Sequence, residues 1–390
     1  MYRDCKLIVI LKKFYIKINN NYLMNYLKKI NIIKEKAKKN EYIELIEEKK
    51  ELKFNIGLAF LRPILQFFVI LTHCYNYNFA TGLWELLIIK FKKFGFHVLI
   101  FFLMSFYFSQ NTLSSSNYKK KFERFERICI PYLLWPIIIY YLNKLLIRCS
   151  ITKNEITIKD LIHQLIFGSG NMSMNMMWYQ WNTILITIVF NLIIFVFRNN
   201  YNFAFIIIAI TAFIFQYNGN NVYFFSNYID YTRTVFGRVI EMIPYTVIGF
   251  LISYSKIIIF LTKYRLQVII ACIYFLYFLI NYEIFYEVKG YGCCGVSSFL
   301  KSICTFIIFA MFPSEKIKNK VIIKIIKQIT NYTAGIYFLH MELSTYLSNY
   351  IIPIKDRTIK GCIILYLICY LCCFLGSHIF GKTKLRHLFE

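Results

Sequence analysis

Arg62 and His73 share one long apolar segment, FNIGLAFLRPILQFFVILTHCYN. An ionisable residue is energetically unfavourable in lipid, so its presence in such a segment indicates a function. Eleven residues separate the two, and at about 100° per residue this spacing is three helical turns plus about 20°. Both residues therefore fall on one stripe of a helix, about 16 Å apart along its axis. A cation at one end of a stripe and a proton-transfer group at the other favours catalysis or transport, and packing against lipid does not explain it.

A second basic pair, Arg124 and Arg127, follows the next apolar segment in the stretch NTLSSSNYKKKFERFERICIPYLLW. Residues three apart lie on the same face of a helical turn. One interpretation is that they anchor a cytoplasmic loop, as basic residues do in most membrane proteins. The other is a phosphate site, because the guanidinium group binds anions through two parallel hydrogen bonds. The spacing alone leaves both interpretations open.

The elements that must position these residues are membrane-spanning helices. Of the 390 residues, 58% are hydrophobic and 17% are charged, whereas a soluble protein has about 25% charged residues. The hydrophobic residues form long runs, which predicts an all-α, polytopic bundle of about ten spans. The predicted spans are 56–76, 94–110, 128–147, 178–197, 203–217, 238–255, 266–282, 296–312, 333–352 and 361–380.

The basic residues predict how the bundle is oriented. With the N-terminus inside, 31 of the 46 Lys and Arg residues lie in the inner loops and tails, so both termini are expected in the cytoplasm. We therefore expect three regions: a charged N-terminal tail (1–55), a ten-helix membrane domain (56–380) and a short basic tail (381–390). The net charge of +26 follows from this topology, and no nucleic-acid-binding module is visible, so we expect no nucleic-acid partner.

Cysteine is abundant, but its positions do not predict a metal site. Cys369 and Cys372 have the spacing of a metal-binding pair, yet both lie inside the last predicted span and no second pair of ligands accompanies them. Cysteine in an apolar span usually packs as a small hydrophobic residue. We therefore expect no metal.

Several motifs occur in an order that resembles one family. They are Arg62 with His73, an aromatic run ending at Ser105, Arg124 and Arg127 leading into Pro131 and Tyr132, the pair Trp178–Tyr179, Glu241 to Gly249, and Tyr337–Phe–Leu–His340. This set resembles the acyltransferase-3 family of integral-membrane acyltransferases, which includes O-acetylases of O-antigens and exopolysaccharides. The resemblance covers about 56–380, the whole predicted bundle.

The resemblance implies an O-acyltransferase of the bacterial cytoplasmic membrane. Its co-substrate would be cytoplasmic acyl-CoA, with acetyl-CoA the expected form, and no cofactor would be tightly bound. The acceptor would be a hydroxyl group of a glycan or lipid-linked sugar, and membrane lipid would surround the bundle. His73 would be the general base, with Arg62 as the second catalytic residue on the same stripe.

The resemblance also assigns supporting residues. Arg62, Arg124 and Arg127 would bind the phosphates or orient the thioester of the donor, and Ser105, Tyr132 and Trp178 would contact the substrates. Glu241 and Glu342 are the acids within the predicted spans, and either carboxylate could hold His73 in its working tautomer. For Glu241, an ion pair with Arg62 or Arg238 is an equally good interpretation. Tyr337 and His340 would support the site, and we expect His340 to be packed or hydrogen-bonded.

One position departs from the family pattern. The family has Ser-Gly-Phe at the end of the second span, and this chain has Ser105-Phe106-Tyr107. Glycine would permit close helix approach, and phenylalanine does not. We therefore expect either a rearranged packing around Phe106 or an impaired enzyme.

Two other functions fit parts of the pattern. A transporter or flippase for lipid-linked sugars or exopolysaccharide would use Arg62 to bind a pyrophosphate and His73 to relay protons, but the sequence shows no internal repeat. An acyltransferase of the membrane-bound O-acyltransferase type would instead place its catalytic histidine in a late span, at His340.

Overall fold

The structure is a computed structural model of the chain. It describes residues 55–74, 97–149, 155–168, 177–218, 230–285, 296–313, 317, 319–350 and 359–382. Nearly all of these belong to one compact unit, Ile56–Glu390. The two predicted tails, 1–55 and 381–390, lie outside the described residues except at 55, 381 and 382.

The described part of the chain is all-α and contains no strand, which confirms the predicted fold class. Each of the ten predicted spans coincides with a helix. The helices are α2 (Ile56–Cys74), α4 (His97–Leu113), α5 (Tyr118–Arg148), α6 (Ile158–Phe167), α7 (Trp178–Phe197), α8 (Tyr201–Asn218), α9 (Asp230–Ile252), α10 (Ser255–Lys263), α11 (Arg265–Phe285), α12 (Val296–Ala310), α13 (Lys320–Asn331), α14 (Thr333–Tyr350) and α15 (Ile359–Gly381). Three of them, α6, α10 and α13, are shorter helices that the hydropathy pattern did not predict.

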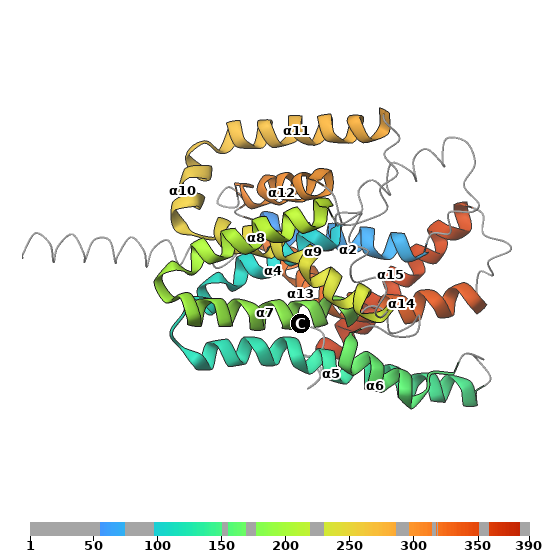
Figure 1. Cartoon of the computed structure of the whole chain (residues 1–390). Coiled ribbons are helices and arrows are strands. Elements are labelled where there is room, and N and C mark those ends of the chain that lie inside the picture. Colours follow the sequence, from blue (N-terminus) through green and yellow to red (C-terminus); the bar gives the residue numbers. More distant parts are fainter. Residues whose placement is uncertain are drawn as a thin grey trace, which may run out of the picture. The chain divides into compact units, whose positions relative to one another are not determined.

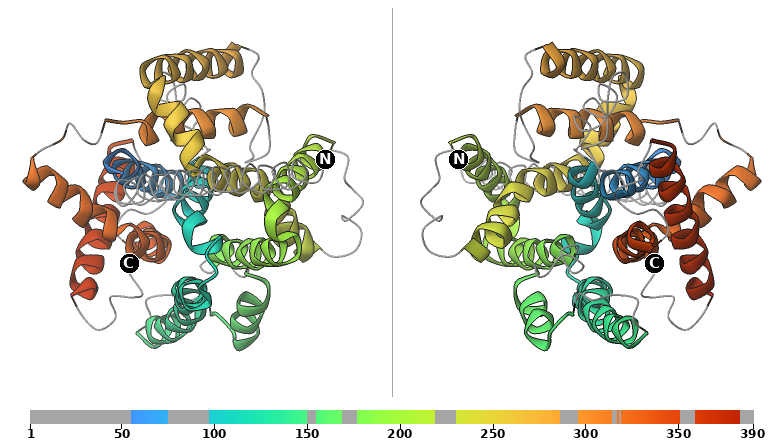
Figure 2. Two further views of the ribbon diagram at one scale, coloured as in Figure 1. Left: turned by 90° about the vertical axis from the view of Figure 1, so that its left-hand side faces the viewer. Right: turned by 90° about the vertical axis from the view of Figure 1, so that its right-hand side faces the viewer.

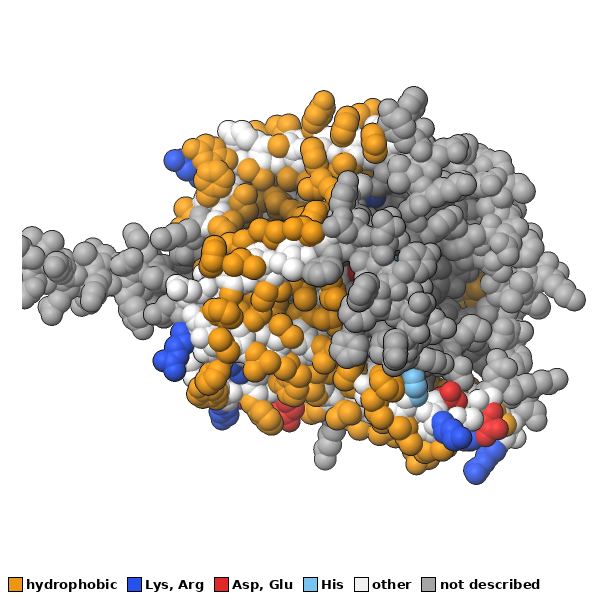
Figure 3. Space-filling model, viewed as in Figure 1, with side chains coloured by type: hydrophobic (Ala, Val, Ile, Leu, Met, Phe, Trp, Pro, Cys, Tyr) orange, Lys and Arg blue, Asp and Glu red, His pale blue; other side chains and the backbone are white. Residues whose placement is uncertain are grey.

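Three described helices are each long and apolar enough to cross a membrane: Tyr118–Arg148, Trp178–Phe197 and Arg265–Tyr282. A fourth span results if Arg238–Ile252 and Ile257–Lys263, which are bent by 74°, count as one broken span. Large apolar side chains cover much of the visible described surface, and Lys and Arg side chains gather toward its ends (Figure 3). The protein is an integral membrane protein, while the number of spans and the side on which the termini lie remain predictions.

The turn after α4, the turn after α7 and helix α10 lie at the same end of the described helices (Figure 1).

Helix α4 is central, because it packs against α2, α5, α7, α9 and α12. The approach of α9 is closest at Gly249, where an added Cβ atom would lie 2.2 Å from the Leu103 carbonyl oxygen. Glycine therefore permits this crossing from the α9 side.

Phe106 is fully buried on α4. Its ring lies against Phe190 of α7, with 4.6 Å between the ring centroids. The packing around α4 thus accommodates the departure from the family pattern, since the aromatic ring occupies space between α4 and α7 while Gly249 provides the close approach to α9.

A proline inside α2 connects this helix to α13. Pro63 has no N–H group, so the carbonyl of Ala59, four residues earlier, lacks its helical partner. The buried hydroxyl of Thr330 lies 2.8 Å from this oxygen and 2.7 Å from the Ile326 carbonyl oxygen of its own helix, and it donates to this pair of oxygens. A side chain of α13 thus satisfies the backbone group that the proline frees, as backbone inside a membrane requires.

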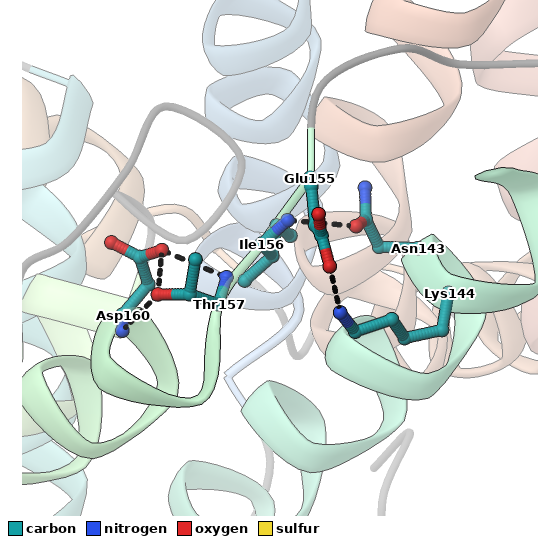
Figure 4. A network of polar contacts seen from close by, with 6 residues as sticks. All are labelled: Asn143, Lys144, Glu155, Ile156, Thr157 and Asp160. Carbon is teal, nitrogen blue, oxygen red and sulfur yellow. Dashed lines mark hydrogen bonds and ion pairs between the residues drawn. The ribbon is translucent and has the colours of Figure 1, made fainter.

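Helices α5 and α6 form an antiparallel hairpin and lie side by side in both views of Figure 2. Polar contacts close it (Figure 4): Lys144 pairs with Glu155, and the Ile156 N–H donates to Asn143 at 2.9 Å. Thr157 begins α6 with a capping box, in which its side chain and that of Asp160 each bond the other's backbone N–H.

Candidate active site

Three of the predicted site residues, Arg62 of α2, Ser105 of α4 and Tyr337 of α14, line one cavity of about 200 Å³. Helices α7 and α13 complete its walls. The other lining residues are Gln66, Val98, Phe101, Met104, Tyr179, Gln180, Thr330 and Thr333. The folded chain therefore brings together residues that are up to 275 positions apart in the sequence.

The phenol of Tyr179, which lines the cavity, interacts with two arginine side chains. Arg62 and Arg124 both lie close enough to Tyr179 to interact with it electrostatically. Tyr179 also interacts with the Ser105 side chain. The aromatic environment holds the cations, because Arg62 Cζ lies 5.2 Å from the centroid of the Phe108 ring and cation–π contacts are favourable in an apolar setting.

The side chains of Arg124 and Arg127 lie in different environments, the first largely buried and the second exposed. Two nitrogens of Arg124, Nε and Nη2, are buried and have no hydrogen-bond partner among the described residues. The Arg124 guanidinium lies over Phe106, with Cζ 5.8 Å from the ring centroid. Arg127 is exposed. Although they lie three residues apart, only Arg124 is directed toward the cavity helices.

Trp178 lies next to the cavity without lining it. Its ring is 6.2 Å from that of Phe102, and the Arg238 guanidinium lies above it, with Cζ 4.6 Å from the ring centroid. The neighbouring Tyr179 faces the cavity instead. The aromatic pair that opens α7 therefore contributes its tyrosine to the cavity wall and its tryptophan to the packing around an arginine.

Tyr132 is part of the α5–α6 hairpin. Its buried hydroxyl is within 2.7 Å of the Gln164 carbonyl oxygen and 2.8 Å of that of Leu165, and it donates to this pair of oxygens. Its ring stacks on Trp181 at 5.6 Å between centroids. These contacts give Tyr132 a structural role at the end of α6, and it is not among the residues that line the cavity.

His340 is fully buried on α14. Its Nδ1 lies 2.6 Å from the carbonyl oxygen of Tyr337. Since a carbonyl oxygen only accepts, Nδ1 carries the proton in this contact. The histidine is therefore packed and hydrogen-bonded, as expected, behind the tyrosine that lines the cavity.

The side chains of two acid–base candidates, His73 and Glu342, lie outside the described residues, and that of Glu241 is described. Helix α2 continues unbroken through His73, so the helical spacing from Arg62 holds for the backbone, but the His73 side chain lies outside the described residues. The same is true of the Glu342 side chain on α14. Glu241 is half-buried on α9. The contacts that the structure gives Arg62 and Arg238 are with aromatic rings, so pairing of either with Glu241 stays a prediction.

The cysteines of the last span show no metal geometry. Cys369 and Cys373 are buried and Cys372 is exposed, so the CxxC pair points in different directions. Cys369 donates to the His340 carbonyl oxygen at 3.5 Å. Within the described ranges, no three His, Cys, Asp or Glu side chains form a cluster that could hold a metal ion.

Sequence reasoning missed five polar residues of the cavity: Gln66, Tyr179, Gln180, Thr330 and Thr333. A signal for Gln66 was present, since it is four residues after Arg62 and so lies on the Arg62–His73 stripe. Tyr179 belongs to the Trp178–Tyr179 motif, of which the sequence pattern assigned Trp178 to the site. Gln180 had no signal beyond its polarity in an apolar segment.

The site thus combines a cation, a hydroxyl and phenols around one cavity, an arrangement that can stabilise negative charge developing on a bound group. A family model described as an acyltransferase domain matches residues 55–381. Neither the curated proteins nor the solved structures that were compared include a match. The match covers the whole helical unit and the motifs that line the cavity. The chain therefore belongs to the acyltransferase-3 family of membrane acyltransferases.

Proposed function

We propose that this protein transfers an acetyl or other short acyl group from cytoplasmic acyl-CoA to a hydroxyl group of a cell-surface or secreted glycan. The observation that carries the proposal is the cavity in which Arg62, Ser105 and Tyr337 meet, in a chain of an acyltransferase family. Tyr179 lines it as well, so four residues of the family motifs, from four helices, share this one cavity.

Arg124 supports an anionic donor. An arginine that is buried without a partner is unfavourable in a membrane protein unless an anion completes its hydrogen bonds. Two of its nitrogens lack partners in the described part of the chain, and a phosphate of CoA would supply the acceptor oxygens. Arg127, exposed near the same end of α5, would reach a second phosphate.

In the proposed reaction, the acceptor hydroxyl oxygen attacks the thioester carbonyl carbon. The C–O bond forms, the C–S bond breaks and CoA leaves as its thiolate. His73 takes the hydroxyl proton and returns it to the thiolate. Arg62 is the cation nearest to the cavity and would stabilise the negative charge that develops on the carbonyl oxygen. No covalent acyl-enzyme is required.

The alternatives make different predictions for the same residues. A flippase for lipid-linked sugars would use the same cations to bind a pyrophosphate, and it would form no acylated product. An enzyme that relied on His340 would need its Nε2 at the reacting atoms, and His340 is not among the residues that line the cavity.

The test uses membranes that contain the full chain, incubated with radiolabelled acetyl-CoA and cell-surface glycan. We expect label in the glycan, and we expect His73→Ala to lower its rate by about 10²- to 10⁴-fold. The matched control is His163→Ala, because His163 lies on α6 with its ring 4.8 Å from Phe167 and does not line the cavity. A wild-type rate in the His73 variant, with loss in His340→Ala, would move the base to α14; absence of labelled product in the wild type would favour transport.

A further inference from the structure

Two buried glutamines face the cavity. Gln66 of α2 is 1% exposed and Gln180 of α7 is 8% exposed. Both amide atoms of Gln66, Nε2 and Oε1, have no hydrogen-bond partner among the described residues, and the same holds for Oε1 of Gln180. Buried polar groups in native proteins are nearly always hydrogen-bonded, so these atoms point to a missing ligand.

The cavity limits what this ligand is. Its volume of about 200 Å³ is below the roughly 300–1,000 Å³ of sites that enclose a complete drug-sized ligand. Only a part of a larger molecule therefore fits. Arg62 is one helical turn before Gln66, and Tyr179 is directly before Gln180, so this part would lie beside the Arg62 cation and the Tyr179 phenol.

The unpaired amide atoms of the two glutamines indicate which chemical group the ligand presents to them. Gln66 offers a donor and an acceptor, and Gln180 offers an acceptor from another helix. A trans secondary amide has its N–H and C=O groups on opposite sides, so two partners on different helices satisfy it better than one. Neither glutamine carries a charge, which argues that the ligand is neutral at this point.

We infer that the cavity binds a secondary amide, with Gln66 and Gln180 as its hydrogen-bond partners. This inference rests on the proposed function and extends it. Secondary amides have two sources in the proposed reaction: the pantetheine arm of CoA, whose first amide is two methylene groups from the sulfur, and the acetamido group of an acceptor sugar. The small cavity, lined by Arg62, favours the arm of the donor.

The experiment compares two acetyl donors that lack the nucleotide. One is the acetyl thioester of N-acetylcysteamine, which carries the amide, and the other is an acetyl thioester of equal chain length with methylene groups in place of the amide. We expect the wild type to prefer the first. Gln66→Met should reduce this preference in kcat/KM by about tenfold, as the loss of a buried hydrogen bond does, and Gln180→Met should reduce it similarly.

Gln164→Met is the matched control. Gln164 is as deeply buried and its amide atoms also lack partners among the described residues, but it lies on α6 and does not line the cavity. This variant should keep the wild-type preference. Because each preference is a ratio within one preparation, partial unfolding of a variant changes both rates and leaves the ratio intact.

A second arm identifies the source. The same variants are tested with an acetamido sugar and the corresponding hydroxyl sugar as acceptors. A change of acceptor preference alone would support the amide site with the sugar as its source. Unchanged preferences in both arms would overturn the inference, as expected if ordered water satisfies the glutamines. A wild type that transfers from no donor, acetyl-CoA included, would instead overturn the proposed function.

Discussion

The cavity and the α5–α6 hairpin both contain buried polar groups, but they satisfy them differently. In the hairpin, the Tyr132 hydroxyl bonds backbone carbonyls and the Ile156 N–H bonds Asn143. At the cavity, both amide atoms of Gln66 and the Oε1 atom of Gln180 are without partners in the described residues. Internal pairing stabilises a fold, whereas unpaired groups that line a cavity are available to a ligand.

Gln164 refines this comparison. It belongs to the hairpin and yet its side-chain amide has no partner among the described residues. What separates it from Gln66 is the adjoining space, because Gln66 lines the cavity and Gln164 does not. An unpaired side-chain amide therefore indicates binding only where it lines a cavity.

The largest expected effect is on the packing beside the cavity. Phe106→Ala should lower the free energy of unfolding by about 3–5 kcal/mol, because it removes a fully buried ring and leaves a void against Phe190. Unfolding in detergent micelles measures this change. Phe195→Ala is the control, since that side chain is 69% exposed and its removal should change the unfolding free energy little. Equal losses in both variants would contradict the packing role of Phe106.

Arg62→Met should separate binding from stability. We expect acyl transfer to fall by about 10²-fold or more, the usual effect of removing a group that stabilises developing charge. Stability should stay near that of the wild type, because the contact of Arg62 with Phe108 is aromatic and methionine retains much of the packing. The matched control is Arg148→Met at the exposed end of α5, which should transfer at the wild-type rate. Equal transfer rates in the two variants would contradict the role of the cavity in the reaction.

Thr330→Val tests the polar contact that joins α13 to α2. It should lower the free energy of unfolding by about 1–3 kcal/mol, because the freed Ala59 carbonyl loses its buried partner. In a Pro63→Ala background the helix can bond that carbonyl itself, so the same substitution should have a smaller effect. The double-mutant cycle measures this coupling, and simple additivity of the two changes would show that Pro63 does not create the need for Thr330.

The smallest expected effect lies in the hairpin. Thr157→Ala removes the N-cap of α6 and should lower the free energy of unfolding by about 0.5–2 kcal/mol. Transfer per folded molecule should not change, since Thr157 is remote from the cavity lining. Thr157→Ser retains the capping oxygen and should restore stability. A loss of specific activity in Thr157→Ala would show that the hairpin contributes to the reaction.

The helices could be predicted from the sequence, and the site could be predicted only in part. Every predicted span coincides with a helix, because an apolar run is a local property that hydropathy reports directly. Arg62, Ser105 and Tyr337 were selected from motifs and share the cavity. Tyr132 was selected on the same grounds, but it bonds α6. A motif records which residues matter and does not tell whether a side chain faces a substrate or a neighbouring helix.

The order of residues alone determined three features: the spacing of Arg62 and His73 on one helix, the apolar spans and the family motifs. Each of them depends only on residues that are close together in the sequence. The meeting of Arg62, Ser105, Tyr179 and Tyr337 around one cavity was decided by tertiary structure. It depends on how each helix is rotated about its axis and how closely it packs, as at Gly249 against Leu103. Those choices arise from contacts between distant segments, and they bring Arg62, one member of the predicted stripe, into the wall of the cavity.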